Sequence, residues 1–291
     1  MNKLFFLHTH YVPKAIIEDC CLAGAVIVPD FYADLNKYYW GTEKSFTNVV
    51  DYLHNNSFID LMNTQIIFSI ENINMINDLS IIPVLKEHGV KVIQLFHGKD
   101  NRYFTLQNGL SLEGIKLLKC MEKSELILDL SHIPDEHIYK ILESYDGRII
   151  VSHCACSDLY KYDSYRSNSL KRSTFSLLSN RKVLFGIAFI NDIISAFPYS
   201  NSENDDILLN DLVEQITYIS SIVGVSQIAL GPDFIDLLHF SRVFGVNLKI
   251  SKYLNSGYGF DLLRASMRGR GFKDKDIDNV YCDNAIEYLR L

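Results

Sequence analysis

Short runs of apolar, β-branched and aromatic residues recur along the whole chain, and each run has the length of a buried β-strand. Successive runs begin roughly 20 to 45 residues apart, which leaves room for a loop and a helix in every interval, as in repeated βαβ units. The eight predicted strands are residues 3–7, 25–28, 66–70, 92–96, 126–130, 148–151, 183–187 and 228–230.

Two of the intervening helices are indicated by apolar residues at helical spacing. We expect the first to end at Gly147 and the second just before Gly224, because glycine commonly follows the last turn of a helix. Two polar stretches, residues 160–180 and 201–206, are predicted loops. The apolar positions are Ile138, Ile141, Leu142 and Tyr145 in the first helix, and Leu212, Ile216, Ile219 and Val223 in the second.

The order of these elements predicts an α/β fold. No linker rich in Pro, Gly or Ser interrupts the eight strand–helix units, and no Gly-rich dinucleotide fingerprint follows a strand. A chain of 291 residues, 48% of them hydrophobic, can bury a large core. We therefore predict one domain over residues 1–291, a (β/α)8 TIM barrel, in preference to an open doubly wound sheet.

Net charge and cysteine content indicate which class of partner the protein binds and in which cellular compartment it works. The formal net charge is -7 and no block of Lys or Arg occurs, which argues against nucleic acid and favours a small-molecule partner. The first ten residues contain too short an apolar stretch for a signal peptide, and no later segment approaches a membrane span. We expect a cytoplasmic protein that does not contact a membrane, and whose six cysteines are reduced thiols. Whether it forms a homodimer is left open.

Polar residues that suit chemistry stand at the ends of the predicted strands, where barrels of this type assemble their active sites. His8 and His10 have the i, i+2 spacing that points both side chains the same way from an extended chain. One such histidine would be unremarkable, since a lone histidine beside an apolar run is more often a hydrogen-bonded core residue. The full set is His8, His10, Glu71, His97, His132, His153 and Asp233.

Imidazoles and carboxylates that converge on one pocket are costly unless they are paired or bind a metal. A donor set of His, Glu and Asp without cysteine suits Zn²⁺, with Mn²⁺ or Fe²⁺ as alternatives. Such an ion lowers the pKa of water and polarises a carbonyl group, while a nearby carboxylate transfers the proton. The residues alone therefore predict a metal-dependent hydrolase acting on an amide or peptide bond.

Five segments in the second part of the chain resemble, in order, the motifs of the renal (membrane) dipeptidase family, peptidase M19. They are NGLSLEGIKLLKCMEKSELILDLSHIPDE, RIIVSHCACSDLY, VLFGIAFIN, VGVSQIALGPDFID and RGFKDKDIDNVYCDNAIEYLR. In the first hundred residues, only His8, Glu71 and the segment FHGKDNRYF add to the resemblance.

The resemblance implies a binuclear metal site in a metal-dependent hydrolase barrel. It assigns Glu71 as the bridging carboxylate, His132 and His153 as ligands of one ion, and His8 as a ligand of the other. It implies that Asp233 handles the proton in catalysis, and that His97 contacts the substrate near the scissile carbonyl. Arg166 matches an arginine that holds the terminal carboxylate of a dipeptide, although its distance from His153 fits the family pattern poorly.

The sequence departs from the family in two places. The family has His-x-Asp after the first strand, whereas this chain has His8 and His10, so a neutral ligand replaces an anionic one. The site could therefore hold one metal ion or two. The interval before Glu71 is also short for the family, so dipeptide specificity does not carry over directly. The alternatives are an amidohydrolase acting on another amide or on a natural-product intermediate, and a metal-binding barrel without turnover.

Overall fold

The computed structural model describes residues 2–10, 12–28, 64–71, 73, 76, 78–160, 168–195, 205–235 and 248–290. Contacts divide the chain into two compact units. The first unit combines both ends of the chain, Met1–Val26 and Ile150–Leu291, and the second is Ile27–Ile149. One domain over residues 1–291 stays a prediction.

Parallel strands form the centre of the first unit. β10 pairs with β8 on one side and with β11 on the other, and β11 pairs in turn with β1. The short strand β9 pairs in parallel with the last two residues of β8. The bounds are β1 (Lys3–Thr9), β2 (Cys21–Ile27), β8 (Ile149–Cys156), β9 (Ser169–Leu170), β10 (Leu184–Ile187) and β11 (Ile228–Leu230).

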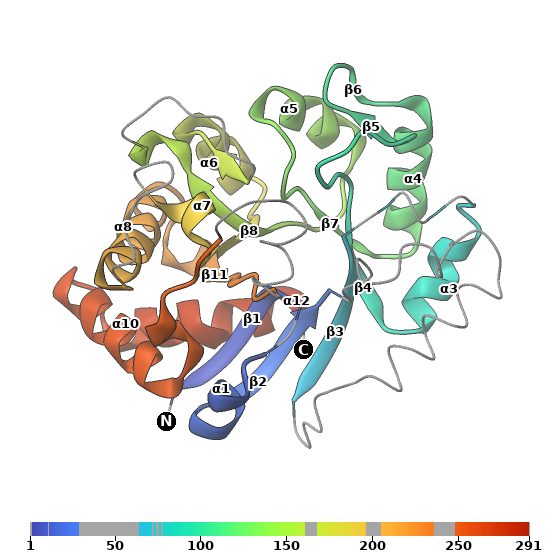
Figure 1. Ribbon diagram of the computed structural model, residues 1–291. Helices are drawn as coiled ribbons and strands as arrows, with labels where there is room; N and C mark the ends of the chain where they lie inside the picture. The colour runs from blue at the N-terminus through green and yellow to red at the C-terminus, as the bar shows by residue number, and fades with distance from the viewer. Residues whose placement is uncertain are drawn as a thin grey trace. The chain divides into compact units, whose positions relative to one another are not determined.

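Helices pack on these strands within the first unit (Figure 1). α8 contacts β10 and β11 together with its neighbours α6, α7 and α10, while η6 and α12 lie against β1 and β11. The bounds are α1 (Lys14–Asp19), η3 (Ser157–Leu159), α6 (Arg172–Ser179), α7 (Asn191–Ile194), α8 (Asp205–Val223), η4 (Val225–Gln227), η5 (Lys252–Asn255), α10 (Gly257–Gly269), α11 (Asp274–Asp278), η6 (Asn279–Asp283) and α12 (Asn284–Leu289).

The second unit contains three further parallel strands, in the order β3, β4, β7. α3 packs against β4 and α4 against β7, and a small antiparallel hairpin of β5 and β6 contacts α5 (Figure 1). The bounds are β3 (Gln65–Ile70), α3 (Ile81–Glu87), β4 (Val90–Gln94), β5 (Phe104–Thr105), β6 (Gly109–Leu110), α4 (Leu112–Lys123), β7 (Ile127–Asp129) and α5 (Asp135–Ser144).

All eight predicted strands are present, and their succession with the helices is the order expected for a (β/α)8 chain. The predicted helix end at Gly224 is confirmed, because α8 stops at Val223 and Gly224 has a φ of 87°. The predicted end at Gly147 is wrong. α5 stops at Ser144, and Tyr145 becomes extended and donates its hydroxyl to the carbonyl of Leu126, 2.5 Å away.

The two predicted loops also need correction. The stretch 160–180 contains β9 and α6, because Thr174, Phe175 and Leu178 form a buried face on an otherwise polar helix. In the stretch 201–206, residues Asp205 and Asp206 are the first turn of α8, where acidic side chains are favourable beside the exposed backbone N–H groups. The rest of these two stretches lies largely outside the described residues.

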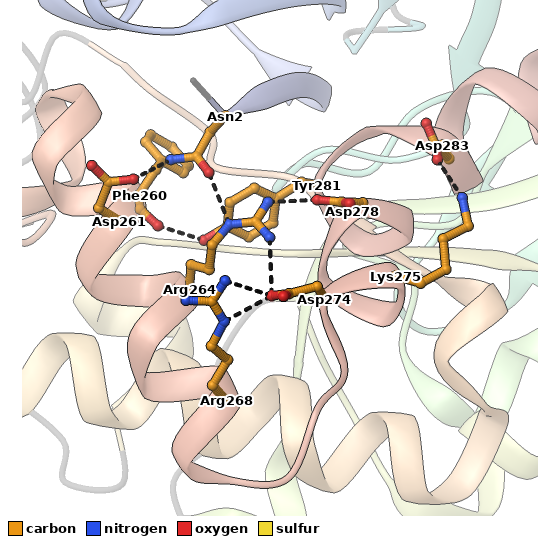
Figure 2. A network of polar contacts seen from close by, with 10 residues as sticks. All are labelled: Asn2, Phe260, Asp261, Arg264, Arg268, Asp274, Lys275, Asp278, Tyr281 and Asp283. Carbon is orange, nitrogen blue, oxygen red and sulfur yellow. Dashed lines mark hydrogen bonds and ion pairs between the residues drawn. The ribbon is translucent and has the colours of Figure 1, made fainter.

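A polar network around Arg264 joins the start of β1 to the C-terminal helices (Figure 2). Arg264 donates to Asn2 at 2.9 Å and to Asp278 at 2.6 Å, and its guanidinium lies 5.2 Å from the ring centre of Tyr281. Asn2 in turn donates to Asp261 at 2.8 Å. The Arg264 side chain is only 16% exposed, so these contacts are partly shielded from water. The network therefore holds the first strand in place.

We expect Arg264→Met to lower the free energy of unfolding by about 2 kcal/mol, because it keeps much of the apolar stem but removes charge-assisted hydrogen bonds. Arg268→Met is the matched control, since Arg268 forms an ion pair with Asp274 at 2.6 Å but its side chain is 54% exposed. Exposed ion pairs contribute about 0 to 1 kcal/mol. Urea denaturation of the three proteins measures the difference, and equal losses for the two variants would contradict the role given to Arg264.

Candidate active site

His8, His10 and Asp233 come together in the first unit where β1 and β11 end. His8 is the sixth residue of β1, and His10 follows the strand directly. The main chain of Asp233 donates to the carbonyl of His8, and that of His10 to the carbonyl of Phe234, both at 3.1 Å. These two bonds fix the side chains so that the Nε2 atoms of both histidines lie 3.5 Å from Asp233 Oδ1.

The Asp233 carboxyl is buried, and its surroundings favour the ionised form. Burial by itself raises the pKa of this group, but the charges of His153 and His8 and hydrogen bonds with His10 and His8 lower the pKa well below its usual range. Asp233 also has a φ of 55°, a left-handed conformation that is uncommon outside glycine. A buried carboxylate in an unusual backbone conformation is typical of a functional position.

These three side chains fit a divalent metal ion. Each offers one ligand atom, and the three atoms lie within 4.8 Å of one another. Imidazole nitrogen and carboxylate oxygen are donors that suit Zn²⁺ and its neighbours among the transition metals. The i, i+2 spacing of His8 and His10 therefore has the predicted result, with both rings on the side of Asp233.

His153 joins this cluster from β8, which continues past it to Cys156. The rings of His8 and His153 lie 3.9 Å apart between their centres. The hydroxyl of Ser152 lies between them, 3.1 Å from His8 Nδ1 and 3.0 Å from His153 Nδ1. Three of these side chains, those of His8, Ser152 and His153, are at most 1% exposed. Ser152 was not among the predicted site residues, and its only signal is a hydroxyl within an apolar strand.

Glu71, His97 and His132 come together in the second unit, beyond the ends of β3, β4 and β7. His97 Nε2 lies 3.7 Å from Glu71 Oε1, and the rings of His97 and His132 are 4.6 Å apart with nearly perpendicular planes. Glu71 is buried, while both histidines are partly exposed. A buried carboxylate beside two imidazoles again has the composition of a metal-binding or proton-transferring group.

The turn that carries His132 is built by a residue that the sequence pattern did not single out. Asp129 is fully buried at the end of β7 and accepts hydrogen bonds from the main chain and the hydroxyl of Ser131, at 2.9 and 2.8 Å. The next residue, His132, has a φ of 66°. The aspartate therefore closes a tight turn that aims His132, and its signal was an acidic residue at the end of an apolar strand.

Arg166, the remaining predicted site residue, lies outside the described residues. Two other histidines make ordinary structural contacts, because His88 bonds the carbonyl of Val84 and His137 that of Leu106. All six cysteines are free thiols. Among the described residues, no helix is both long and apolar enough to cross a membrane.

Solved structures of very low sequence identity share the fold of this chain. An amidohydrolase from Pseudomonas aeruginosa superposes with a TM-score of 0.77 at 17% identity, covering 99% of this chain and 96% of the other. A metallo peptidase from Rhodobacter sphaeroides gives a TM-score of 0.75 at 12% identity and covers 99% of both chains. The predicted fold class is thus confirmed, and the chain is a (β/α)8 barrel.

Curated relatives are similar in sequence. The dipeptidase tcpJ of Claviceps purpurea is 24% identical over 222 residues, which are 74% of this chain and 47% of the relative. The dipeptidase verJ of Clonostachys rogersoniana is 23% identical over 231 residues, 77% of this chain and 54% of the relative. The chain spans about half the length of these relatives. The family model for membrane dipeptidase (peptidase family M19) matches residues 43–290, and the chain belongs to that family.

Proposed function

We propose that this protein is a metal-dependent hydrolase that cleaves the peptide bond of a dipeptide or the amide bond of a related small substrate. The observation that carries the proposal is the cluster of His8 and His10 on the buried carboxylate of Asp233, in a chain of the membrane dipeptidase family. A divalent ion suits this donor set, and hydrolysis of small amides suits the ion.

The metal ligands we propose are the five that the sequence indicated, His8, His10, Glu71, His132 and His153. By the family pattern, Glu71 would be shared by two ions, His132 and His153 would hold one of them, and His8 would hold the other. Zinc is the proposed ion because neutral imidazoles and carboxylates with no sulfur suit it, and Mn²⁺ or Fe²⁺ would suit the same donors.

Zinc, when bound, supplies a Lewis acid that polarises the scissile carbonyl and lowers the pKa of water. Asp233 then accepts the proton of the attacking water and returns it to the leaving amine, a role that its ionised state permits. His97, partly exposed and held near Glu71, donates a hydrogen bond to the carbonyl oxygen as charge develops there. Arg166 is proposed to bind the carboxylate of a dipeptide.

The substrate class rests on relatives and on one substitution. The Rhodobacter sphaeroides metallo peptidase is liganded with a phosphinate mimic of the dipeptide L-Ala-D-Ala, which supports a dipeptide here. The neutral His10 stands where the family has an aspartate, and it favours a second candidate, an amidohydrolase acting on another small amide or a natural-product intermediate. The cytoplasmic location stays a prediction.

Metal removal tests this function directly. We expect the purified protein to hold one to two equivalents of zinc, and we expect chelation to abolish the hydrolysis of a dipeptide panel until zinc is restored. His132→Ala and His10→Ala should each lose metal and cleavage. His88→Ala is the matched control, because His88 is exposed and its ring contacts the carbonyl of Val84 in the adjoining helix α3.

The outcomes separate the candidates. Zinc with cleavage of N-acyl or cyclic amides, but not of dipeptides, would support the second candidate. A protein that binds no zinc, manganese or iron after reconstitution would contradict any metal-dependent hydrolase. Bound metal without cleavage of the dipeptides or of the other amides would indicate a metal-binding barrel without catalytic activity.

A further inference from the structure

The hydroxyl of Ser152 contacts two proposed ligands at once. Its Oγ lies 3.1 Å from Nδ1 of His8, which is on β1, and 3.0 Å from Nδ1 of His153, its neighbour on β8. Both distances are those of good hydrogen bonds, and the group is shielded from solvent. One hydroxyl therefore faces the same ring nitrogen of two imidazoles.

The chemistry of the three groups limits how these bonds form. A serine hydroxyl has two acceptor lone pairs, and a neutral imidazole carries its proton on one of two nitrogens. If Oγ accepts from both Nδ1–H groups, both Nε2 atoms keep a lone pair for a metal. If it donated to either ring, that ring would carry its proton on Nε2 and lose its ligand atom. A hydrogen bond at one ring nitrogen commonly fixes the tautomer of a ligating histidine.

The main chain holds this hydroxyl in place. The carbonyl of Ser152 packs directly against Gly186 on β10 and Gly231 after β11. A Cβ atom added to Gly186 would lie 1.9 Å from the Ser152 carbonyl oxygen, and one added to Gly231 would lie 2.0 Å from it. At this residue the main chain of β8 therefore lies in close contact with the backbones of both glycines. The pairing of β8 with β10 and this close packing fix the main chain that carries the Ser152 hydroxyl.

We propose that Ser152 is a positioning residue that accepts a hydrogen bond from Nδ1–H of both His8 and His153 and so presents both Nε2 atoms as metal ligands. The proposal rests on the proposed function, which assigns these histidines to different ions. Ser152 would then couple the two proposed metal sites, because loss of its hydroxyl removes the hydrogen bond that orients one histidine ligand of each site. A residue that only filled space would not affect both.

Zinc affinity, measured by chelator competition, tests the proposal. We expect Ser152→Ala to weaken both zinc equivalents by about 10- to 100-fold, the usual effect of removing a hydrogen-bond partner of a ligating histidine. Ser152→Thr, which keeps the hydroxyl, should restore affinity to within a few-fold, and Ser152→Cys, a weak acceptor, should not. Ser251→Ala is the control, because Ser251 is equally buried and its hydroxyl donates to the carbonyl of Asp205 at the start of α8.

A spectroscopic readout separates positioning from packing. In ¹⁵N-histidine spectra of the zinc-loaded protein, slowly exchanging Nδ1–H signals are expected for His8 and His153 in the wild type and in Ser152→Thr, and rapid exchange in Ser152→Ala. Wild-type affinity in Ser152→Ala, or weakening of only one equivalent, would overturn this inference and leave the proposed function intact. A wild-type protein that binds no zinc would overturn both.

Discussion

Asp233→Asn should lower kcat/KM for the best substrate by about 10² to 10⁴-fold, the range measured for loss of a general acid–base group. The substitution keeps the shape of the side chain and replaces the carboxylate with a neutral amide. Asparagine tolerates the left-handed backbone that Asp233 adopts, so the turn after β11 should survive. Rates are compared at saturating zinc, so that weaker metal binding does not mimic a loss of proton transfer.

The control for this variant is Asp192→Asn, the same chemical change at an exposed residue in the first turn of α7. It should leave both zinc content and rate unchanged. If Asp233→Asn retained more than a tenth of the wild-type rate with its zinc complement intact, Asp233 would have no part in proton transfer. The carboxylate would then serve only to orient His8 and His10, which it faces at 3.5 Å.

Sequence reasoning pointed to the candidate site residues because each one interrupts an apolar strand or follows one within three residues. A buried strand needs apolar side chains, so His8, Glu71 or His132 at its end has no packing explanation. The same reasoning placed all eight strands. It did not give their lengths, because β8 continues through Ser152 and His153 as a fully buried strand, and a polar residue within a strand does not show where pairing stops.

The structure shows contacts and backbone conformations that the spacing of apolar residues along the sequence cannot predict. Ser152 and Asp129 are short polar residues whose importance depends on neighbours that are distant in sequence or turned towards them by the backbone. The left-handed conformation of His132 and Asp233 is likewise not required by either residue type. It stands beside the Asp129–Ser131 bonds in the first case and beside the main-chain bond from Asp233 to the carbonyl of His8 in the second. Tyr145 lies outside the helix that was predicted to include it, and its hydroxyl donates to the carbonyl of Leu126. This tertiary contact outweighs the helical spacing of the apolar residues.

Gly231→Ala should strongly destabilise the protein, because the glycine lies where three backbones meet. The added Cβ would lie 2.0 Å from the carbonyl oxygen of Ser152 and 3.1 Å from the main chain of Gly186. All of these atoms belong to the backbone, so no side-chain rotation relieves the clash. Overpacking a core commonly costs about 1 to 3 kcal/mol, and we expect the upper end of that range or a failure to fold.

Gly269→Ala gives the matched comparison, since nothing lies within 4 Å of its added Cβ at the end of α10. It should stabilise the protein by up to about 1 kcal/mol, the usual gain when alanine replaces a helical glycine. Urea denaturation measures both changes. Any folded Gly231→Ala protein should also bind zinc more weakly, because displacing Ser152 moves the hydroxyl that orients His8 and His153. Wild-type stability in that variant would contradict the close packing of β8, β10 and β11 on which the position of Ser152 depends.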